Sequence, residues 1–146
     1  MISRREDLPR GLSDRLGFLV GRAHLAHRAV TGPALAPFGL SPKGFGALTV
    51  LVEEGPLSQQ RLGERQGVDR TTMVAVVDEL EQGALVERRR DPDDRRAYSL
   101  EATPKGRRML KEAVKAAERA EEEFLAGIPA RDRAELKRIL RALIAP

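Results

Sequence analysis

The sequence predicts a mainly α-helical protein that carries one small β-hairpin. Apolar residues recur at spacings of three and four along most of the chain, the pattern of helices that each bury one face. Polar capping residues precede several of these periodic segments and mark where the helices begin. The stretch VERRRDPDDRRAYSL (86–100) places Asp-Pro-Asp-Asp between two segments suited to strands, which is typical of a hairpin.

The composition is that of a globular chain with an aliphatic core. The 146 residues suit one domain or one subunit of a small oligomer. Hydrophobic residues make up 41% and aromatic residues 3%, while 26 Lys and Arg against 22 Asp and Glu leave a net charge of +4. Because this sum is small, the placement of charge is more informative than its total. The absence of cysteine excludes disulfides, thiol catalysis and thiolate metal sites.

Several classes of protein find no support in the sequence. No apolar run approaches the roughly 20 residues that cross a bilayer, and the start MISRREDLPRGL lacks the apolar segment of a signal peptide. We therefore expect a cytoplasmic protein without a membrane partner. There is no glycine loop of the phosphate-binding kind, and two histidines do not make a Ser-His-Asp set, so we expect neither enzymatic activity nor a cofactor.

The first helix is predicted to start with Ser13 as its cap and to run to Gly32-Pro33, which should end or kink it. Its apolar stripe consists of Leu12, Leu16, Leu19, Val20, Ala23 and Val30. Nothing large elsewhere in the chain is available to cover this stripe.

Three further helices are predicted to begin with the same pattern of capping residues. A polar cap follows an apolar residue, and a second apolar residue lies five positions after the first, so that the two can form a hydrophobic staple. The caps are Ser41, Ser58 and Asp69, with the staple pairs Leu40 and Phe45, Leu57 and Leu62, and Val68 and Met73. These helices are expected to run to Gly55, to Gln66 and to about Gln82.

The second half of the chain predicts the hairpin and two more helices. Strands over 86–90 and 96–100 flank Asp91-Pro92-Asp93-Asp94, which suits a type I turn. Thr103 followed by Pro104 is the start of a long helix. A last helix carries an apolar face of Leu136, Ile139, Leu140, Leu143 and Ile144, and Pro129 at its start offers no capping side chain.

The short helix after Ser58, the turn at 66–68 and the helix after Asp69 predict a helix-turn-helix. An arginine-rich hairpin follows directly, so the whole is expected to be a winged helix-turn-helix lobe. In such a lobe the second helix enters the DNA major groove with its first residues against the base edges. These residues are Arg70, Thr71 and Thr72, followed on the outward face by Val74 and Ala75.

The arginines of the hairpin are candidate contacts of the wing with DNA. Arg95 or Arg96 is expected to form the tip and enter a minor groove, where a guanidinium loses its water readily. We expect Asp94 to hold the Arg96 guanidinium in bidentate geometry. Phosphate contacts along one edge are assigned to Arg88, Arg89 and Arg90. The alternative is a solvated hairpin whose charges cancel in pairs.

With these residues in place, the sequence resembles the MarR family, the multiple-antibiotic-resistance regulators. The resemblance covers residues 12–144 and is most specific in GVDRTT, LVERRRDPDDRR and TPKG. It implies a homodimer joined by the first, fifth and sixth helices, bound to near-palindromic promoter DNA as a repressor that a phenolic or lipophilic effector releases. It also matches Ser58, Gln59 and Gln60 to a phosphate-facing helix start, and Asp94 and Arg96 to the Asp-x-Arg of the wing.

Two departures from the family pattern are specific to this chain. Position 75, often arginine in relatives, is Ala75 beside Val74, which removes a guanine reader and leaves methyl groups suited to thymine. A thymine-containing half-site is therefore expected. Gly83-Ala84 reverses the usual Ala-Gly order, so the sequence places the end of the helix at either residue.

The domains predicted from this pattern are a helical dimerisation domain (1–36 and 104–146) and a DNA-binding domain (37–103). On the first helix, His24, His27 and Arg28 are candidate effector contacts. His24 and His27, three residues apart, could instead sense a metal, although the sequence shows no third ligand. Another alternative is a winged helix that binds protein rather than DNA, for which an exposed apolar recognition face would be the signature.

Overall fold

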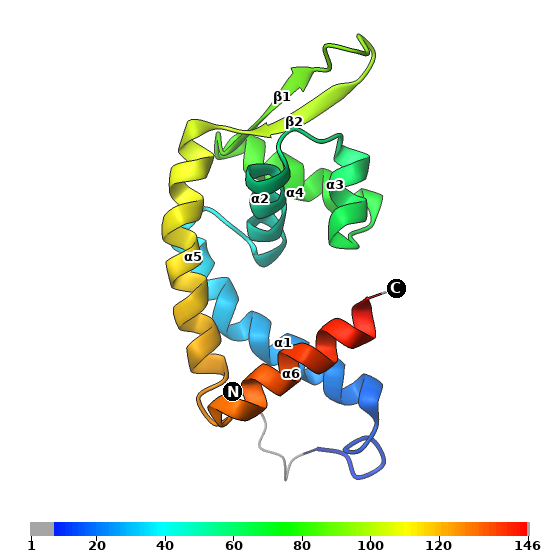
Figure 1. Cartoon of the computed structure of the whole chain (residues 1–146), viewed down its shortest axis with the longest axis vertical. Helices are drawn as coiled ribbons and strands as arrows, with labels where there is room; N and C mark the ends of the chain where they lie inside the picture. Colours follow the sequence, from blue (N-terminus) through cyan, green and yellow to red (C-terminus); the bar gives the residue numbers. More distant parts are fainter. Residues whose placement is uncertain (1–7, 146) are drawn as a thin grey trace. The chain divides into compact units, whose positions relative to one another are not determined.

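The computed structural model describes residues 8–145 of the chain, which fold as two compact units (Figure 1). One unit, called the lobe below, is Thr31–Ala117. The other, called the outer unit, combines Met1–Val30 with Glu118–Pro146 and is described from residue 8 to residue 145.

The described chain is mainly helical and has one two-stranded antiparallel sheet, as the sequence predicts. The elements are α1 (Leu16–Leu35), a 3₁₀ turn (Ala36–Phe38), α2 (Pro42–Glu54), α3 (Gln59–Gln66), α4 (Arg70–Gln82), β1 (Val86–Arg90), β2 (Tyr98–Ala102), α5 (Pro104–Phe124) and α6 (Ala130–Ile144). No single described helix is both long and apolar enough to span a membrane; only α1 with its 3₁₀ extension and α2, taken together across a 63° bend, meet a criterion of length and composition.

The predicted helix starts at Ser41, Ser58 and Asp69 are confirmed. Each side chain accepts a hydrogen bond from the backbone N–H three residues later, at 3.0, 3.2 and 2.9 Å respectively. Thr103 caps α5 in the same way, because its hydroxyl accepts from the N–H of Gly106 at 3.0 Å. These contacts satisfy amide groups that have no partner within the helix.

The predicted cap of the first helix is wrong, and Gly32-Pro33, expected to end or kink the helix, does not end it. Ser13 is not its cap, since the Ser13 hydroxyl donates to the carbonyl of Arg10 at 3.1 Å and α1 begins at Leu16. Pro33 lies inside α1, which continues to Leu35. A proline within a helix removes one backbone hydrogen bond, but Leu35 is only 2% exposed in the lobe core, and this burial favours the additional turn.

The lobe is built around an aliphatic core shared by α2, α3, α4 and the sheet. Its fully buried large side chains are Leu35, Leu48, Leu51, Leu62, Met73, Val77, Leu80, Leu85 and Leu100. The segment before α3 joins the sheet, because Leu57 and Leu100 exchange backbone hydrogen bonds of 3.1 and 2.7 Å. The compact lobe is wider than the segment 37–103, since Leu35 and Leu110 belong to its core.

The hairpin is present, but its turn lies further along the chain than predicted. Val86 pairs with Ala102 and Arg90 with Tyr98, so the second strand starts at residue 98 rather than 96. The carbonyl of Asp94 accepts from the N–H of Ala97 at 3.0 Å, which places a turn over 94–97. The carboxylates of Asp91 and Asp94 each accept from the backbone N–H two residues later, at 2.8 and 2.9 Å. Two successive aspartate turns therefore lengthen the loop.

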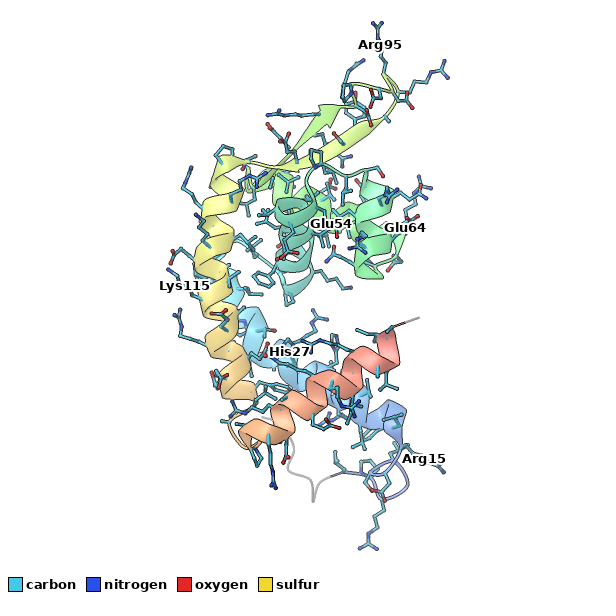
Figure 2. The ribbon with its side chains drawn as sticks, viewed as in Figure 1. Arg15, His27, Glu54, Glu64, Arg95 and Lys115 are labelled. Carbon is cyan, nitrogen blue, oxygen red and sulfur yellow. The ribbon has the colours of Figure 1, made fainter. Side chains whose placement is uncertain are left out.

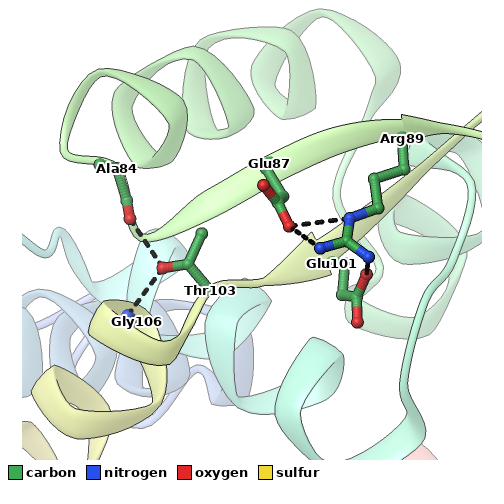
Figure 3. A network of polar contacts seen from close by, with 6 residues as sticks. All are labelled: Ala84, Glu87, Arg89, Glu101, Thr103 and Gly106. Atoms are coloured by element: carbon green, nitrogen blue, oxygen red, sulfur yellow. Dashed lines mark hydrogen bonds and ion pairs between the residues drawn. The ribbon is translucent and has the colours of Figure 1, made fainter.

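The end of α4 resolves the Gly83-Ala84 ambiguity. Gly83 keeps a right-handed backbone with φ −76°, whereas Ala84 has φ 55° and is the sole non-glycine residue with positive φ in the described chain. Figure 3 shows that the Ala84 carbonyl accepts the Thr103 hydroxyl, at 2.7 Å. An alanine in this conformation costs about 1 kcal/mol relative to glycine.

The outer unit leaves most of its large apolar side chains exposed. On α1 and the segment before it, these are Leu12, Leu16, Leu19, Val20 and Leu25. On α6 they are Leu136, Ile139, Leu140, Leu143 and Ile144. Among its described residues only Ala120 and Leu125 are buried. As predicted, α6 begins after Pro129 without a side-chain cap.

Candidate nucleic-acid interface

The turn between α3 and α4 is tight and depends on two glycines. Gly67 ends α3 with φ 63°, a left-handed conformation that glycine adopts without strain. A side chain at Gly63 would place its Cβ 3.0 Å from the carbonyl of Val68. This close approach brings α3 and α4 together around an open hollow lined by Gln59, Gln60, Gly63, Glu64, Gly67, Val68, Asp69, Arg70 and Met73.

The first two turns of α4 present the residues predicted to contact bases. Arg70, Thr71 and Ala75 are exposed and Val74 is 43% exposed, while the opposite side of the helix is buried in the core. Thr72 is different, because its hydroxyl and its backbone N–H both donate to the carboxylate of Asp69, at 2.6 and 2.9 Å. Both hydrogen bonds lower the pKa of the Asp69 carboxyl, and the bond from the Thr72 hydroxyl has the larger effect.

Long-range polar contacts, which no local sequence pattern predicts, hold α4 and α3 against α2. Glu79 of α4 accepts from the backbone N–H and the hydroxyl of Ser41, at 3.0 and 3.1 Å, at the start of α2. Arg65 of α3 pairs with Glu54 of α2, and this hydrogen bond lowers the pKa of the Glu54 carboxyl. Both partners are distant in the sequence, so no periodic pattern marks them.

The predicted phosphate-facing start of α3 is half-buried rather than fully exposed. Ser58 is engaged as the cap of α3, and its neighbour Gln59 is also half-buried. Gln60 is exposed and its amide donates to Glu64 at 2.9 Å. The two glutamines border the same hollow as Arg70, so the α3 and α4 residues predicted to contact DNA lie together in the structure.

Two of the five wing arginines are occupied by acidic partners. The Arg88 Nε lies 3.1 Å from both carboxylate oxygens of Glu81, and an Arg88 terminal nitrogen is 4.0 Å from Asp78. Arg89 donates to Glu87 at 2.8 Å and lies 3.3 Å from Glu101, as Figure 3 shows. Hydrogen bonding to Glu87, with the charge of Glu101, raises the pKa of Arg89.

The remaining wing arginines have no ion pair within residues 8–145. Arg90 lies 5.9 Å from the centroid of the Tyr98 ring, within range of a cation–π contact. Arg95 and Arg96 occupy the two central positions of the turn over 94–97 and are exposed. Figure 2 shows Arg95 at the far end of the hairpin, with its side chain pointing outward from the lobe.

The expected bidentate contact between Asp94 and the Arg96 guanidinium is wrong. The Asp94 carboxylate accepts instead from the backbone N–H of Arg96, at 2.9 Å. Asp94 therefore shapes the loop rather than holding the arginine side chain. The alternative of pairwise charge cancellation describes Arg88 and Arg89, but not Arg95 and Arg96.

The candidate effector residues lie in the outer unit. His24 and Arg28 are exposed, whereas His27 is half-buried with its ring edge-on to Phe124, at a centroid distance of 5.3 Å. Within the described residues, no group of three or more histidine, cysteine or acidic side chains could hold a metal ion. The structure thus supplies no third ligand near the two histidines.

A helix-turn-helix whose second helix leads directly into a two-stranded hairpin defines a winged helix. Residues 38–97 match the MarR family model. The transcriptional repressor Rv2887 of Mycobacterium tuberculosis is 30% identical over 91% of this chain and 97% of its own length. The chain belongs to the MarR family, whose members are transcriptional regulators and not enzymes.

Solved structures show the same fold over nearly the whole chain. A MarR-family regulator from Rhodococcus sp. RHA1 superposes with a TM-score of 0.84 at 30% identity, covering 94% of this chain and 98% of that one. BpsR of Bordetella bronchiseptica, whose DNA binding is regulated by 6-hydroxynicotinic acid, superposes with a TM-score of 0.85 at 26% identity, covering 95% and 99%.

Proposed function

We propose that this protein is a dimeric, sequence-specific repressor that a small effector releases from a near-palindromic operator. The observation that carries the DNA-binding part is the pairing of an exposed α4 start with a wing whose tip arginines have no acidic partner in the described chain. A helix presents sequence-reading groups to the major groove, and an unpaired guanidinium is attracted to the narrow minor groove.

The proposed contacts with DNA are of two kinds: contacts with base edges and contacts with the phosphate backbone. Arg70 and Thr71 reach base edges, and the exposed methyl groups of Val74 and Ala75 contact thymine methyls. Thr72 supports these contacts indirectly, because its hydroxyl donates to Asp69 and so helps to cap the start of α4. Ser58, Gln59, Gln60 and Arg90 contact phosphates, and the tip arginines Arg95 and Arg96 enter the minor groove, where they neutralise the phosphates that border it.

Dimerisation is proposed from the apolar surface of the outer unit. Leu16 is 67% exposed and Leu143 is 63% exposed, and each belongs to a run of apolar side chains along its helix. A second copy of the chain is the cover that the family pattern implies, and a two-fold symmetric pair presents two recognition helices about 34 Å apart. Two such helices require an operator of two inverted half-sites.

The effector is proposed to be a small aromatic acid that contacts His24, His27 and Arg28. The exposed guanidinium of Arg28 is suited to a carboxylate, and His27 already packs against the ring of Phe124. The regulation of BpsR by 6-hydroxynicotinic acid supports this chemical class. A screen of hydroxylated aromatic acids for release of bound DNA would identify the effector.

The DNA-binding proposal is tested by selecting binding sequences from a random duplex pool and measuring affinity against salt. We expect inverted half-sites that contain thymine, and a decline of log affinity with log salt of about 0.9 per phosphate neutralised. Arg70→Ala should relax selection at one position of each half-site. Selection of guanine-centred half-sites without thymine would refute the roles of Val74 and Ala75, and salt-independent binding would refute the interface as a whole.

A further inference from the structure

The wing arginines differ in their surroundings although five of them lie within nine residues. Arg88 and Arg89 are each held between two carboxylates, from Asp78 and Glu81 in one case and from Glu87 and Glu101 in the other. Each group of one arginine and two acids carries a formal charge of −1. A phosphate approaching either guanidinium would therefore meet net negative charge at close range.

Arg88 and Arg89 also lie on opposite faces of the hairpin. Successive side chains of a strand point to opposite faces of the sheet. Arg88 shares the face of Val86, which is 3% exposed, and this face turns toward α4, where Asp78 and Glu81 lie. Arg89 lies on the other face with Glu87 and Glu101. Three consecutive arginines therefore do not form one continuous phosphate-binding edge.

The contacts of Arg88 join the two DNA-reading parts of the lobe. Asp78 and Glu81 belong to the second half of α4, and Arg88 belongs to the middle of β1. Between these elements the chain passes through Gly83 and Ala84, where Ala84 has a strained positive φ. A guanidinium bonded to Glu81 through Nε, at 3.1 Å to both oxygens, restrains the angle between α4 and the hairpin across this joint.

We infer that Arg88 is a positioning residue, which sets the wing against the recognition helix through Glu81 and Asp78, while the tip arginines neutralise DNA phosphates from the minor groove. This inference rests on the proposed DNA-binding function and deepens it. Arg89 plays a related part within the hairpin, because it joins β1 to β2 through Glu101 and pairs with Glu87 on its own strand. The wing then consists of a rigid, locally acidic base and a free cationic tip.

The test compares Arg88→Gln with Arg95→Gln in the full chain, on one selected operator duplex over a range of salt concentrations. A lost phosphate contact lowers the slope of log affinity against log salt by about 0.9 per subunit. We expect this change for Arg95→Gln. For Arg88→Gln we expect Kd to rise about 3- to 10-fold, as for the loss of a contact that couples two elements, while the slope stays at the wild-type value.

A charge exchange supplies the matched control. Arg88→Glu combined with Glu81→Arg keeps the net charge and restores an ion pair between α4 and β1, so we expect affinity to return to within about 3-fold of wild type. Amide exchange of the hairpin without DNA should be faster in Arg88→Gln and slow again in the exchanged pair. This second measurement needs no DNA and also shows that each variant is folded.

Three outcomes would overturn the inference. One is a slope that falls by about 0.9 per subunit in Arg88→Gln, which would make Arg88 a phosphate contact. Another is an exchanged pair that binds no better than Arg88→Gln, and the third is an unchanged Kd in Arg88→Gln. If instead the wild-type protein binds no duplex, the proposed function itself is wrong. That result is distinguishable from failure of the inference, because it is obtained with the wild-type protein before any variant is measured.

Discussion

The lobe buries the large apolar side chains of its helices, whereas the outer unit leaves most of its own exposed. In the lobe, large side chains such as Leu48, Leu62 and Leu80 are completely buried. In the outer unit, Leu16, Leu143 and Ile144 are 63–80% exposed. The lobe buries its large apolar side chains within one chain, whereas most of those in the outer unit stay exposed among the described residues.

This contrast separates folding from assembly. A core residue of the lobe contributes to the free energy of unfolding at any protein concentration. If a second molecule covers the apolar residues of the outer unit, as the proposed dimer requires, their contribution rises with concentration. Four sets of substitutions test how each unit is stabilised.

The largest effect is expected in the lobe core. Leu62→Ala removes a side chain that is 0% exposed between α3 and its neighbours, and should reduce the free energy of unfolding by about 2–5 kcal/mol. Chemical denaturation at two protein concentrations measures this change, which should be the same at both. Leu143→Ala, at 63% exposure, is the control and should have little effect in dilute solution.

The next effect is on assembly. Leu140→Glu places a charge on the apolar face of α6, where Leu140 is 43% exposed. If that face is the dimer interface, the dissociation constant should rise at least about 30-fold, equivalent to about 2 kcal/mol. Sedimentation of the variant against Arg131→Ala, an exposed position on the same helix, provides the comparison. A variant that dimerises like the wild type would place the interface elsewhere.

A smaller effect is expected at the cap of the recognition helix, with a definite dependence on pH. Thr72 lowers the pKa of Asp69 below its ordinary value of 3.8, so the ionised carboxylate stabilises the fold above that pH. Asp69→Ala should lower Tm by about 3–6 °C near neutral pH. The difference from wild type should close as the pH falls through the lowered pKa. A difference that widens below pH 4 would contradict the assignment.

The smallest effect concerns the joint between α4 and β1. Ala84→Gly relieves the strain at φ 55°, and Gly83→Ala suits the right-handed backbone at φ −76°. A Cβ at residue 83 would lie 3.4 Å from Leu85 Cγ, close to ordinary contact. The double exchange should therefore stabilise the lobe by about 1 kcal/mol. Gly83→Ala alone is the control, and a double variant less stable than wild type would refute the argument.

Local sequence signals predicted the lobe well because they act within a few residues. A capping side chain bonds to an amide three positions away, so Ser41, Ser58 and Asp69 were recognisable without knowledge of the fold. The hairpin was predicted, but its turn was placed on Asp91–Asp94. Two aspartates that bind backbone amides compete with the proline signal and move the turn to 94–97.

Periodicity, caps and turn residues are local signals, and they are enough to predict the order of the helices, the exposed start of α4 and an arginine-rich hairpin. The passage of α1 through Pro33 into the core, the left-handed conformation of Ala84 and the pairing of Arg88 with Glu81 are visible only in the folded chain. These outcomes depend on groups that are distant along the chain or belong to different elements. Their positions follow from packing, because burial and charge pairing act on distance in space and not on separation in sequence.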